Sequence, residues 1–272
     1  MRPEQELLER EILAALSGCD RVEVFIAPHL YDLSADGATF EFLRGVSGDL
    51  VVLSWLYPRS AFWVLDAQGV RGKLGRTSSL LESETEDAMA GSHVREGVPD
   101  RTLWCFDLRT HAEAGRYADE IARLAGAAPA VKTNGHPHQI AEATQSRWYP
   151  VVDLDRCNGC LECVNFCLFG VFGLDPVDLP QIEQPDACRP GCPACARICP
   201  QGAIMFPQHQ DPAIAGAPGK SPSELKLDLS QLFRGLTPAE IAAMERAQAQ
   251  KNQPDTSPDL DRLIDRLDDM DL

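Results

Sequence analysis

The sequence predicts a small α/β layer domain, then a compact α+β domain built around cysteines, then an acidic tail that is largely disordered. Three observations lead to this prediction. Strand-like and helix-like segments alternate over residues 1–126, and eight of the ten cysteines fall within residues 157–199. After residue 207 the chain is rich in Pro, Ala, Gly and Asp, a composition that buries little apolar surface. We therefore expect the α/β domain over residues 1–126, a linker over 127–147, the cysteine-rich domain over 148–207 and the tail over 208–272.

The front domain begins with an amphipathic pattern, because Leu8, Ile12 and Leu16 recur at helical spacing among glutamates. The β-branched apolar run at Asp49–Leu56 has the character of a buried strand. Gly126 is placed to stop a last helix. The expected order is a helix over 4–16, a strand over 22–26, a short helix over 39–46, a strand over 49–56, a hairpin over 62–73, a polar loop over 77–100, a strand over 102–108 and a helix over 111–124.

The two cysteine runs carry the clearest chemistry. The first reads C-N-G-C-L-E-C-V-N-F-C at 157–167, and the second reads C-R-P-G-C-P-A-C-A-R-I-C-P at 188–200. Each has three close cysteines and a fourth after three further residues, a spacing typical of iron–sulfur ligation. The alternative is two zinc sites of four cysteines each. Structural zinc usually pairs two C-x-x-C knuckles, so a third close cysteine would have no purpose there.

Residues 147–207 resemble the bacterial-type two-cluster ferredoxin. The resemblance rests on both cysteine runs, on a strand-like segment at 149–153 before the first and on Gln201–Ile204 after the second. It implies a ferredoxin-like dicluster fold with two [4Fe-4S] clusters and crossed ligation, in which the fourth cysteine of each run serves the other cluster. On this sequence the first cluster takes Cys157, Cys160, Cys163 and Cys199. The second takes Cys188, Cys192, Cys195 and Cys167.

Two departures from that family fall on the second cluster. Leu168 stands where the family usually has proline, and three residues rather than two separate Cys188 from Cys192. Leu168 restores a backbone N–H, and Arg189 brings a cation into the longer loop. Because both changes stabilise the reduced, more negative cluster, we predict that the second cluster has the higher potential. The alternatives are neutral drift in a tolerant loop and a cluster that lacks one iron.

Charge and hydropathy restrict the function. The chain has 25 Lys and Arg against 41 Asp and Glu, a net charge of -16, and no segment is basic. The footprint of a nucleic-acid binder is therefore missing. An acidic surface either steers basic protein partners or only keeps the chain in solution.

The first ten residues are too charged for a signal peptide, and the apolar stretch at Leu50–Leu56 is far shorter than the ~20 residues of a membrane span. We expect a cytoplasmic location, where cysteines stay reduced.

Other candidate residues are weaker. No G-x-G-x-x-G follows a strand, so no nucleotide site is predicted. Polar residues that follow predicted strands could bind an anion or supply a proton: His29, Tyr31, Asp32, Tyr57, Arg59, Asp107, Arg109 and His111. In the alternative, Asp107 and Thr110 cap turns and the others are ordinary loop residues. The remaining candidates are a basic patch at Arg71, Lys73 and Arg76, and two histidines, His136 and His138, that are either metal ligands or linker residues. Cys105 is expected to be a buried hydrophobe, and Cys19 is assigned no role.

Two functional hypotheses follow, with a third, weaker one. In the first, the chain is an iron–sulfur electron carrier or electron-transfer subunit, and its front domain selects a redox partner protein such as a reductase, a dehydrogenase or another electron donor or acceptor. In the second, the chain is a small oxidoreductase whose front domain binds a substrate. In the third, loss of the cluster acts as a redox signal.

In the tail, Thr237 and Pro238 predict a helix start, and an acidic amphipathic stripe runs over Leu260–Met270.

Overall fold

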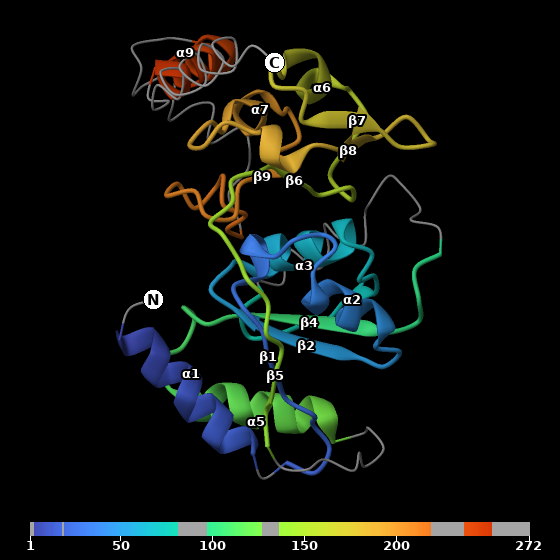
Figure 1. Ribbon diagram of the computed structural model, residues 1–272, viewed down its shortest axis with the longest axis vertical. Helices are drawn as coiled ribbons and strands as arrows, with labels where there is room; N and C mark the ends of the chain where they lie inside the picture. The colour runs from blue at the N-terminus through green and yellow to red at the C-terminus, as the bar shows by residue number, and fades with distance from the viewer. Residues whose placement is uncertain (1–2, 18, 81–96, 127–135, 219–236, 252–272) are drawn as a thin grey trace, which may run out of the picture.

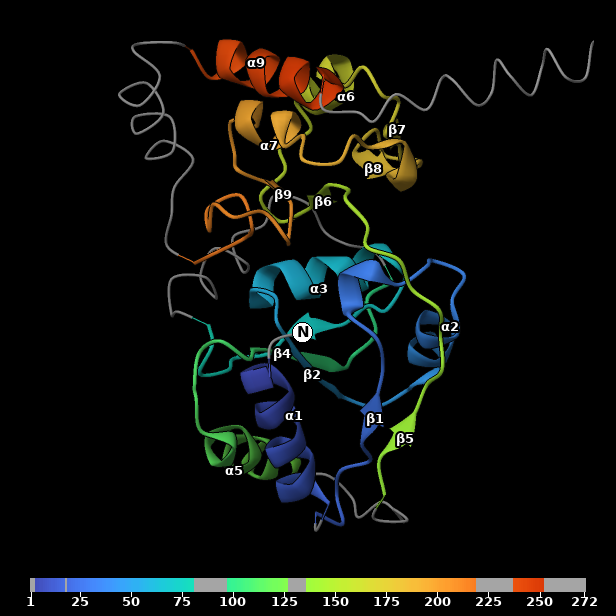
Figure 2. The same cartoon turned by 60° about the vertical axis from the view of Figure 1, so that its left-hand side comes forward.

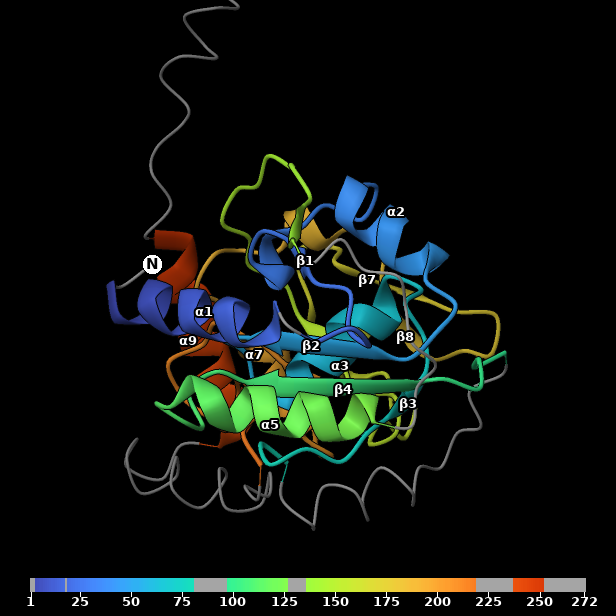
Figure 3. The same ribbon diagram turned by 90° about the horizontal axis from the view of Figure 1, so that it is seen from below.

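The computed structural model describes residues 3–17, 19–80, 97–126, 136–218 and 237–251. Its front half contains a parallel sheet in the order β2-β4-β3, formed by Leu50–Ser54, Thr102–Asp107 and Lys73–Leu74. Helices lie on both sides of this sheet (Figure 1; Figure 3 shows its lower side from below). The result is a layered α/β arrangement of the kind that alternating strands and helices produce.

The helices below the sheet are α1 (Pro3–Leu16) and α5 (Ala114–Ala125). Leu8, Ile12 and Leu16 of α1 are buried with Tyr117 and Ile121 of α5, against the apolar side chains of β2 and β4. Both predicted helices are confirmed, because each carries an apolar stripe at helical spacing that the sheet can bury.

The predicted hairpin over residues 62–73 is wrong. Residues Pro58–Ala67 form helix α3, which begins with proline at its first position and is buried from Pro58 through Asp66. It lies between the sheet and the cysteine-rich region, so it has no exposed face and no helical alternation of polar and apolar residues (Figure 1). The later part of the expected hairpin is β3, a parallel neighbour of β4.

The predicted linker contributes a strand. β5 (His138–Gln139) pairs in parallel with β1 (Phe25–Ile26), which is shorter than the strand expected over 22–26. Further along, the Glu142 carboxylate accepts a hydrogen bond from the Thr39 backbone at 2.9 Å. Thr39 lies in the first turn of α2 (Ala38–Gly45), the short helix that the sequence predicts, so Glu142 caps that helix from about a hundred residues away.

The cysteine-rich region is a small α+β unit above the sheet (Figure 1). Two antiparallel strand pairs frame it, β6 (Val151–Val152) with β9 (Ile204–Met205) and β7 (Phe172–Leu174) with β8 (Pro180–Ile182). Each run also has a short helix that contains its third cysteine, α6 (Glu162–Phe166) with Cys163 and α7 (Ala194–Ile198) with Cys195. Two 3-10 turns are also present among the described residues, η1 (Leu30–Asp32) and η2 (Pro185–Ala187).

Part of the expected tail packs against the rest of the molecule. Ile214 and Ala215 are buried, and helix α9 (Pro238–Lys251) lies across α7 (Figure 2). The predicted helix start at Thr237 is confirmed. Its hydroxyl accepts from the Glu240 backbone at 3.3 Å, while the Glu240 carboxylate accepts from the Thr237 backbone at 2.7 Å. The stripe over Leu260–Met270 lies outside the described residues.

A continuous core joins the front domain to the cysteine-rich region. Val151 and Met205 belong to the same buried cluster as Phe62, Leu65 and other residues of α3. The rings of Tyr31 and Tyr149 stack with centroids 4.3 Å apart. The Tyr31 hydroxyl also accepts from the Tyr149 backbone N–H at 2.7 Å and donates to the Tyr149 carbonyl. Because these buried polar groups pair across the boundary, the two parts are packed as one folded unit.

Candidate metal centre

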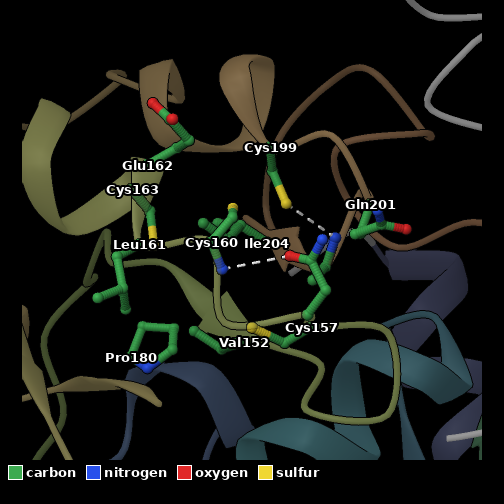
Figure 4. Close-up of a pocket in the computed structure, with 12 residues that line it drawn as sticks. Val152, Cys157, Cys160, Leu161, Glu162, Cys163, Pro180, Cys199, Gln201 and Ile204 are labelled. Carbon is green, nitrogen blue, oxygen red and sulfur yellow. Dashed lines mark hydrogen bonds between the residues drawn. The ribbon is translucent and has the colours of Figure 1, made fainter. Parts of the chain in front are cut away.

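Four cysteines from both runs line one small cavity. Cys157, Cys160 and Cys163 come from the first run, and Cys199 comes from the end of the second (Figure 4). Val152, Leu161, Pro180 and Ile204 supply apolar walls. This is the set of four that the ferredoxin resemblance implies for the first cluster. Cys160 is exposed, whereas Cys157, Cys163 and Cys199 are buried, so the cavity reaches the surface on the Cys160 side.

The backbone of the first run turns tightly around this cavity. Gly159 and Leu161 both have positive φ, 69° and 59°, and Leu161 is one of only two described non-glycine residues in that conformation. Backbone N–H groups bond the cysteine sulfurs here: the Gly159 N–H bonds the Cys157 sulfur, and from the segment after the second run the Ala203 N–H reaches the Cys199 sulfur at 3.3 Å. Amide donors of this kind tune an iron–sulfur centre. A strained non-glycine residue in a ligand loop is a feature that spacing alone does not reveal.

The remaining four cysteines are the set that the ferredoxin resemblance implies for the second cluster, and they are called the second group below. Burial raises the pKa of Cys195 well above its ordinary value, and the neighbouring thiols of Cys188, Cys167 and Cys192 raise it further. Burial, followed by the neighbouring thiols of Cys192 and Cys167, raises the pKa of Cys188 to about 12. In the first group, burial and then Cys199 raise the pKa of Cys163 to about 12. Buried thiols whose pKa is raised in this way need a bound cation to persist as thiolates.

The donor set fits iron–sulfur clusters. Each group offers four thiols, and apolar walls and backbone donors surround the first. Among the described residues, no three His, Cys, Asp or Glu side chains are arranged to hold a single metal ion.

Both departures from the ferredoxin pattern lie at the second group. Leu168 is exposed to 67%, so its side chain leaves the cluster loop for solvent. The extra residue between Cys188 and Cys192 is accommodated by Gly191, whose φ is +77°. The Arg189 guanidinium lies 5.6 Å from the centroid of the Phe169 ring, beside the second group rather than free in solvent.

Helix α9 covers one side of the second group. Ala242 of α9 is fully buried in a cluster with Cys192 and Ala194. The Arg246 guanidinium donates to the Phe166 carbonyl at 2.8 Å and lies 4.1 Å from the centroid of the Phe166 ring. Arg197 of α7 pairs with Glu245 of α9 at 3.1 Å. The sequence predicts this helix but gives no sign of where it packs.

An ion pair between the two domains was also missed by sequence reasoning. Arg59 of α3, expected at a strand end of the front sheet, instead donates to the Asp153 carboxylate and, at 2.7 Å, to the Gly202 carbonyl. Asp153 and Gly202 immediately adjoin residues of the first cavity. In the sequence, only the short distance from Asp153 to Cys157 indicates that Asp153 belongs near the site.

The other residues predicted at strand ends engage separate partners. Both carboxylate oxygens of Asp107 accept from the Arg109 guanidinium at 2.7 Å, and Arg109 lies 3.9 Å from the centroid of the Tyr57 ring. The Asp107 carboxylate also accepts from the Arg109 backbone, so its predicted turn-capping role is confirmed. His111 contacts Ser78 at 3.2 Å. His29 contacts Asp32 at 3.5 Å, while Tyr31 pairs with Tyr149, so the expected constellation is not a single site.

The other candidate residues lie at the edges of the front domain. His136 and His138 line a shallow pocket with Cys19, and His138 contacts Glu23 at 3.6 Å. Within the basic patch, Lys73 pairs with Asp100 at 2.7 Å, and both side chains are exposed. Cys105 is fully buried, as predicted. Every described helix is too short or too polar to cross a membrane.

Comparison with known proteins places part of the chain among iron–sulfur proteins. It is 35% identical over 66 residues to an uncharacterized ferredoxin of Methanocaldococcus jannaschii, a match that covers 24% of this chain and 44% of that protein. It is 34% identical over 70 residues to the B component of the polysulfide reductase of Wolinella succinogenes, covering 22% and 35%. It is 37% identical over 71 residues to adenylylsulfate reductase subunit beta of Megalodesulfovibrio gigas, covering 24% and 42%.

The chain thus spans less than half the length of each of these relatives. No protein-family profile matches the chain, and no solved structure matches it. The four-cysteine cavity and the three similarities agree: about a quarter of this chain is similar to ferredoxin-like iron–sulfur proteins, which supports an iron–sulfur electron-transfer domain of the bacterial ferredoxin type.

Proposed function

We propose that this protein transfers single electrons between redox partner proteins through two [4Fe-4S] clusters. The first would be held by Cys157, Cys160, Cys163 and Cys199, and the second by Cys188, Cys192, Cys195 and Cys167. The observation that carries the proposal is the convergence of cysteines from both runs on one cavity. Two of the similar proteins are reductase components by name, which favours a reductase-type partner.

When bound, a [4Fe-4S] cluster supplies one-electron exchange. The chain's residues would hold and adjust it. Thiolates would ligate the iron, while Val152, Ile204 and Pro180 would surround the bound cluster with apolar side chains. The Gly159 and Ala203 N–H groups, which bond cysteine sulfurs, favour added negative charge there. Exposed Cys160 marks the side from which a partner would approach the first cavity most closely.

The decisive test is anaerobic purification followed by iron and sulfide analysis. Two cubes require about eight irons and eight sulfides per chain, and a visible absorption that bleaches on reduction. A pair of zinc ions, or an absence of sulfide, would refute the proposal. Ligand variants sharpen the assignment: Cys199→Ser should perturb the cluster held by the first run, and Cys167→Ser the other. Cys19→Ser is the matched control, because Cys19 lies outside both groups and should leave iron content unchanged.

The proposed partner is tested by anaerobic pull-down with the whole chain. Stable recovery of a reductase or dehydrogenase that reduces or oxidises the bound clusters supports the carrier function. Tight retention of a small molecule that the clusters then reduce would instead support the oxidoreductase alternative, in which the front domain binds substrate.

A further inference from the structure

We infer that Arg59, on helix α3 of the front domain, is a positioning residue for the first cysteine cavity and sets the reduction potential of the group bound there. This inference rests on the proposed iron–sulfur function and deepens it, because it makes the front domain part of the redox centre rather than only a docking module. It starts from the most buried cation that joins the two domains.

Arg59 is only 6% exposed and reaches two separate segments of the cysteine-rich region. Its Nε donates to the Asp153 carboxylate, and its Nη2 donates to the Gly202 carbonyl at 2.7 Å. A buried guanidinium must have partners, since leaving it unpaired in the interior costs several kcal/mol. The contact therefore holds both segments against α3.

Those two segments carry ligands of the first cavity. The Asp153 carbonyl accepts from the Cys157 N–H at 3.0 Å, which starts the turn of the first run. Gly202 follows Cys199 by three residues, and its N–H bonds the Cys199 carbonyl at 3.3 Å. The neighbours of Asp153 and Gly202 in the chain, Val152 and Ala203 among them, line the cavity itself. One side chain of the front domain thus fixes the positions of both cysteine segments.

The local charge balance gives the sign of the effect. Asp153 is 3% exposed and faces Arg59, with Arg156 also 3.7 Å from its carboxylate. Reduction adds negative charge to the bound group, so a nearby buried cation raises its potential and a buried carboxylate lowers it. Salt screens such buried charges weakly. Removing Arg59 alone would leave the negative charge of Asp153 less compensated and so lower the potential. Removing the Asp153 charge alone would leave the positive charges of Arg59 and Arg156 and so raise the potential.

A charge cycle tests this on the full chain with clusters bound. We expect Arg59→Gln to shift one midpoint potential to a more negative value, Asp153→Asn to shift the same one to a more positive value, and the double variant to lie between them. Arg59→Lys, which keeps the charge, should shift it less than Arg59→Gln. Redox titration followed by electron paramagnetic resonance supplies the readout, and the potential of the other cluster is an internal reference.

Arg101→Gln is the matched control, because Arg101 is equally buried at 6% but bonds the Arg71 and Val46 carbonyls within the front domain. Its potentials should equal those of the wild type. Single-variant shifts in the same direction, or an equal shift in Arg101→Gln, would show a general structural effect and overturn the inference. If Arg59→Gln does not fold, the Asp153→Asn variant decides by itself, and an unchanged potential in that variant overturns the inference. A wild type without iron and sulfide refutes the proposed function itself, which is a different result.

Discussion

Replacing Arg246 with methionine should release helix α9 from the second cysteine group. The methionine keeps an apolar stem against Phe166, but it loses the 2.8 Å hydrogen bond to the Phe166 carbonyl and the contact of the charge with the ring. A charge-assisted hydrogen bond contributes roughly 1.5–3 kcal/mol, and a partly exposed cation–π contact roughly 0.5–1 kcal/mol. After allowance for solvent near α9, we expect a loss of about 2 kcal/mol, which raises the detached population roughly 30-fold.

Hydrogen exchange of the α9 amides measures this population directly, because local opening limits exchange in a docked helix. We expect peptides from residues 238–251 to exchange roughly 30-fold faster in Arg246→Met. The control is Met244→Ala on the same helix, since Met244 is 53% exposed and should leave exchange unchanged. Equal exchange in the two variants would refute the docking argument. A second measurement, the rate at which a chelator bleaches the iron–sulfur absorption, should rise with detachment, because Ala242 packs beside Cys192.

Three further predictions concern other contacts. Tyr31→Phe should lower the free energy of unfolding by about 2–3 kcal/mol in urea titration, because it leaves the buried Tyr149 N–H and carbonyl without a partner; an unchanged midpoint would show that the two domains separate at little cost. Partial burial opposes ionisation of Glu142, but hydrogen bonds from Thr39 outweigh it and hold its pKa below the ordinary 4.5. The stabilisation by Glu142 is therefore complete above about pH 4.5 and is lost as the pH falls through the folded-state pKa. The melting temperatures of wild type and Glu142→Gln should differ near neutral pH and converge in acid. A difference that stays constant with pH would exclude this linkage. In a redox titration the second cluster should have the higher potential, and Leu168→Pro should lower it by removing a backbone donor; a lower potential in the second cluster of the wild type would contradict this.

The packing of the domains changes how the front domain is understood. As a separate docking module it would tolerate mutation without effect on the clusters. In the structure, Tyr31 and Arg59 reach into the cysteine-rich region, and Val151 and Met205 belong to the core of the front domain. We therefore expect substitutions in α3 to alter the redox centre as well as the stability of the fold.

The sequence by itself predicted an iron–sulfur site. Cysteine spacing predicts iron–sulfur ligation, because three thiols from one short loop must converge on one cube. The helices α1, α2 and α5 and the start of α9 were also predictable, since apolar stripes and capping residues are local signals.

Tertiary structure decided what local signals cannot carry. Helix α3 was mistaken for a hairpin because burial on all sides removes the polar–apolar alternation on which such predictions depend. The pairing of β5 with β1, the cap that Glu142 places on α2, the contact of Arg59 with Asp153 and the packing of α9 on α7 all join residues far apart in the chain. The energy of each contact comes from a partner that only the folded chain brings within reach, so no pattern within either segment encodes it.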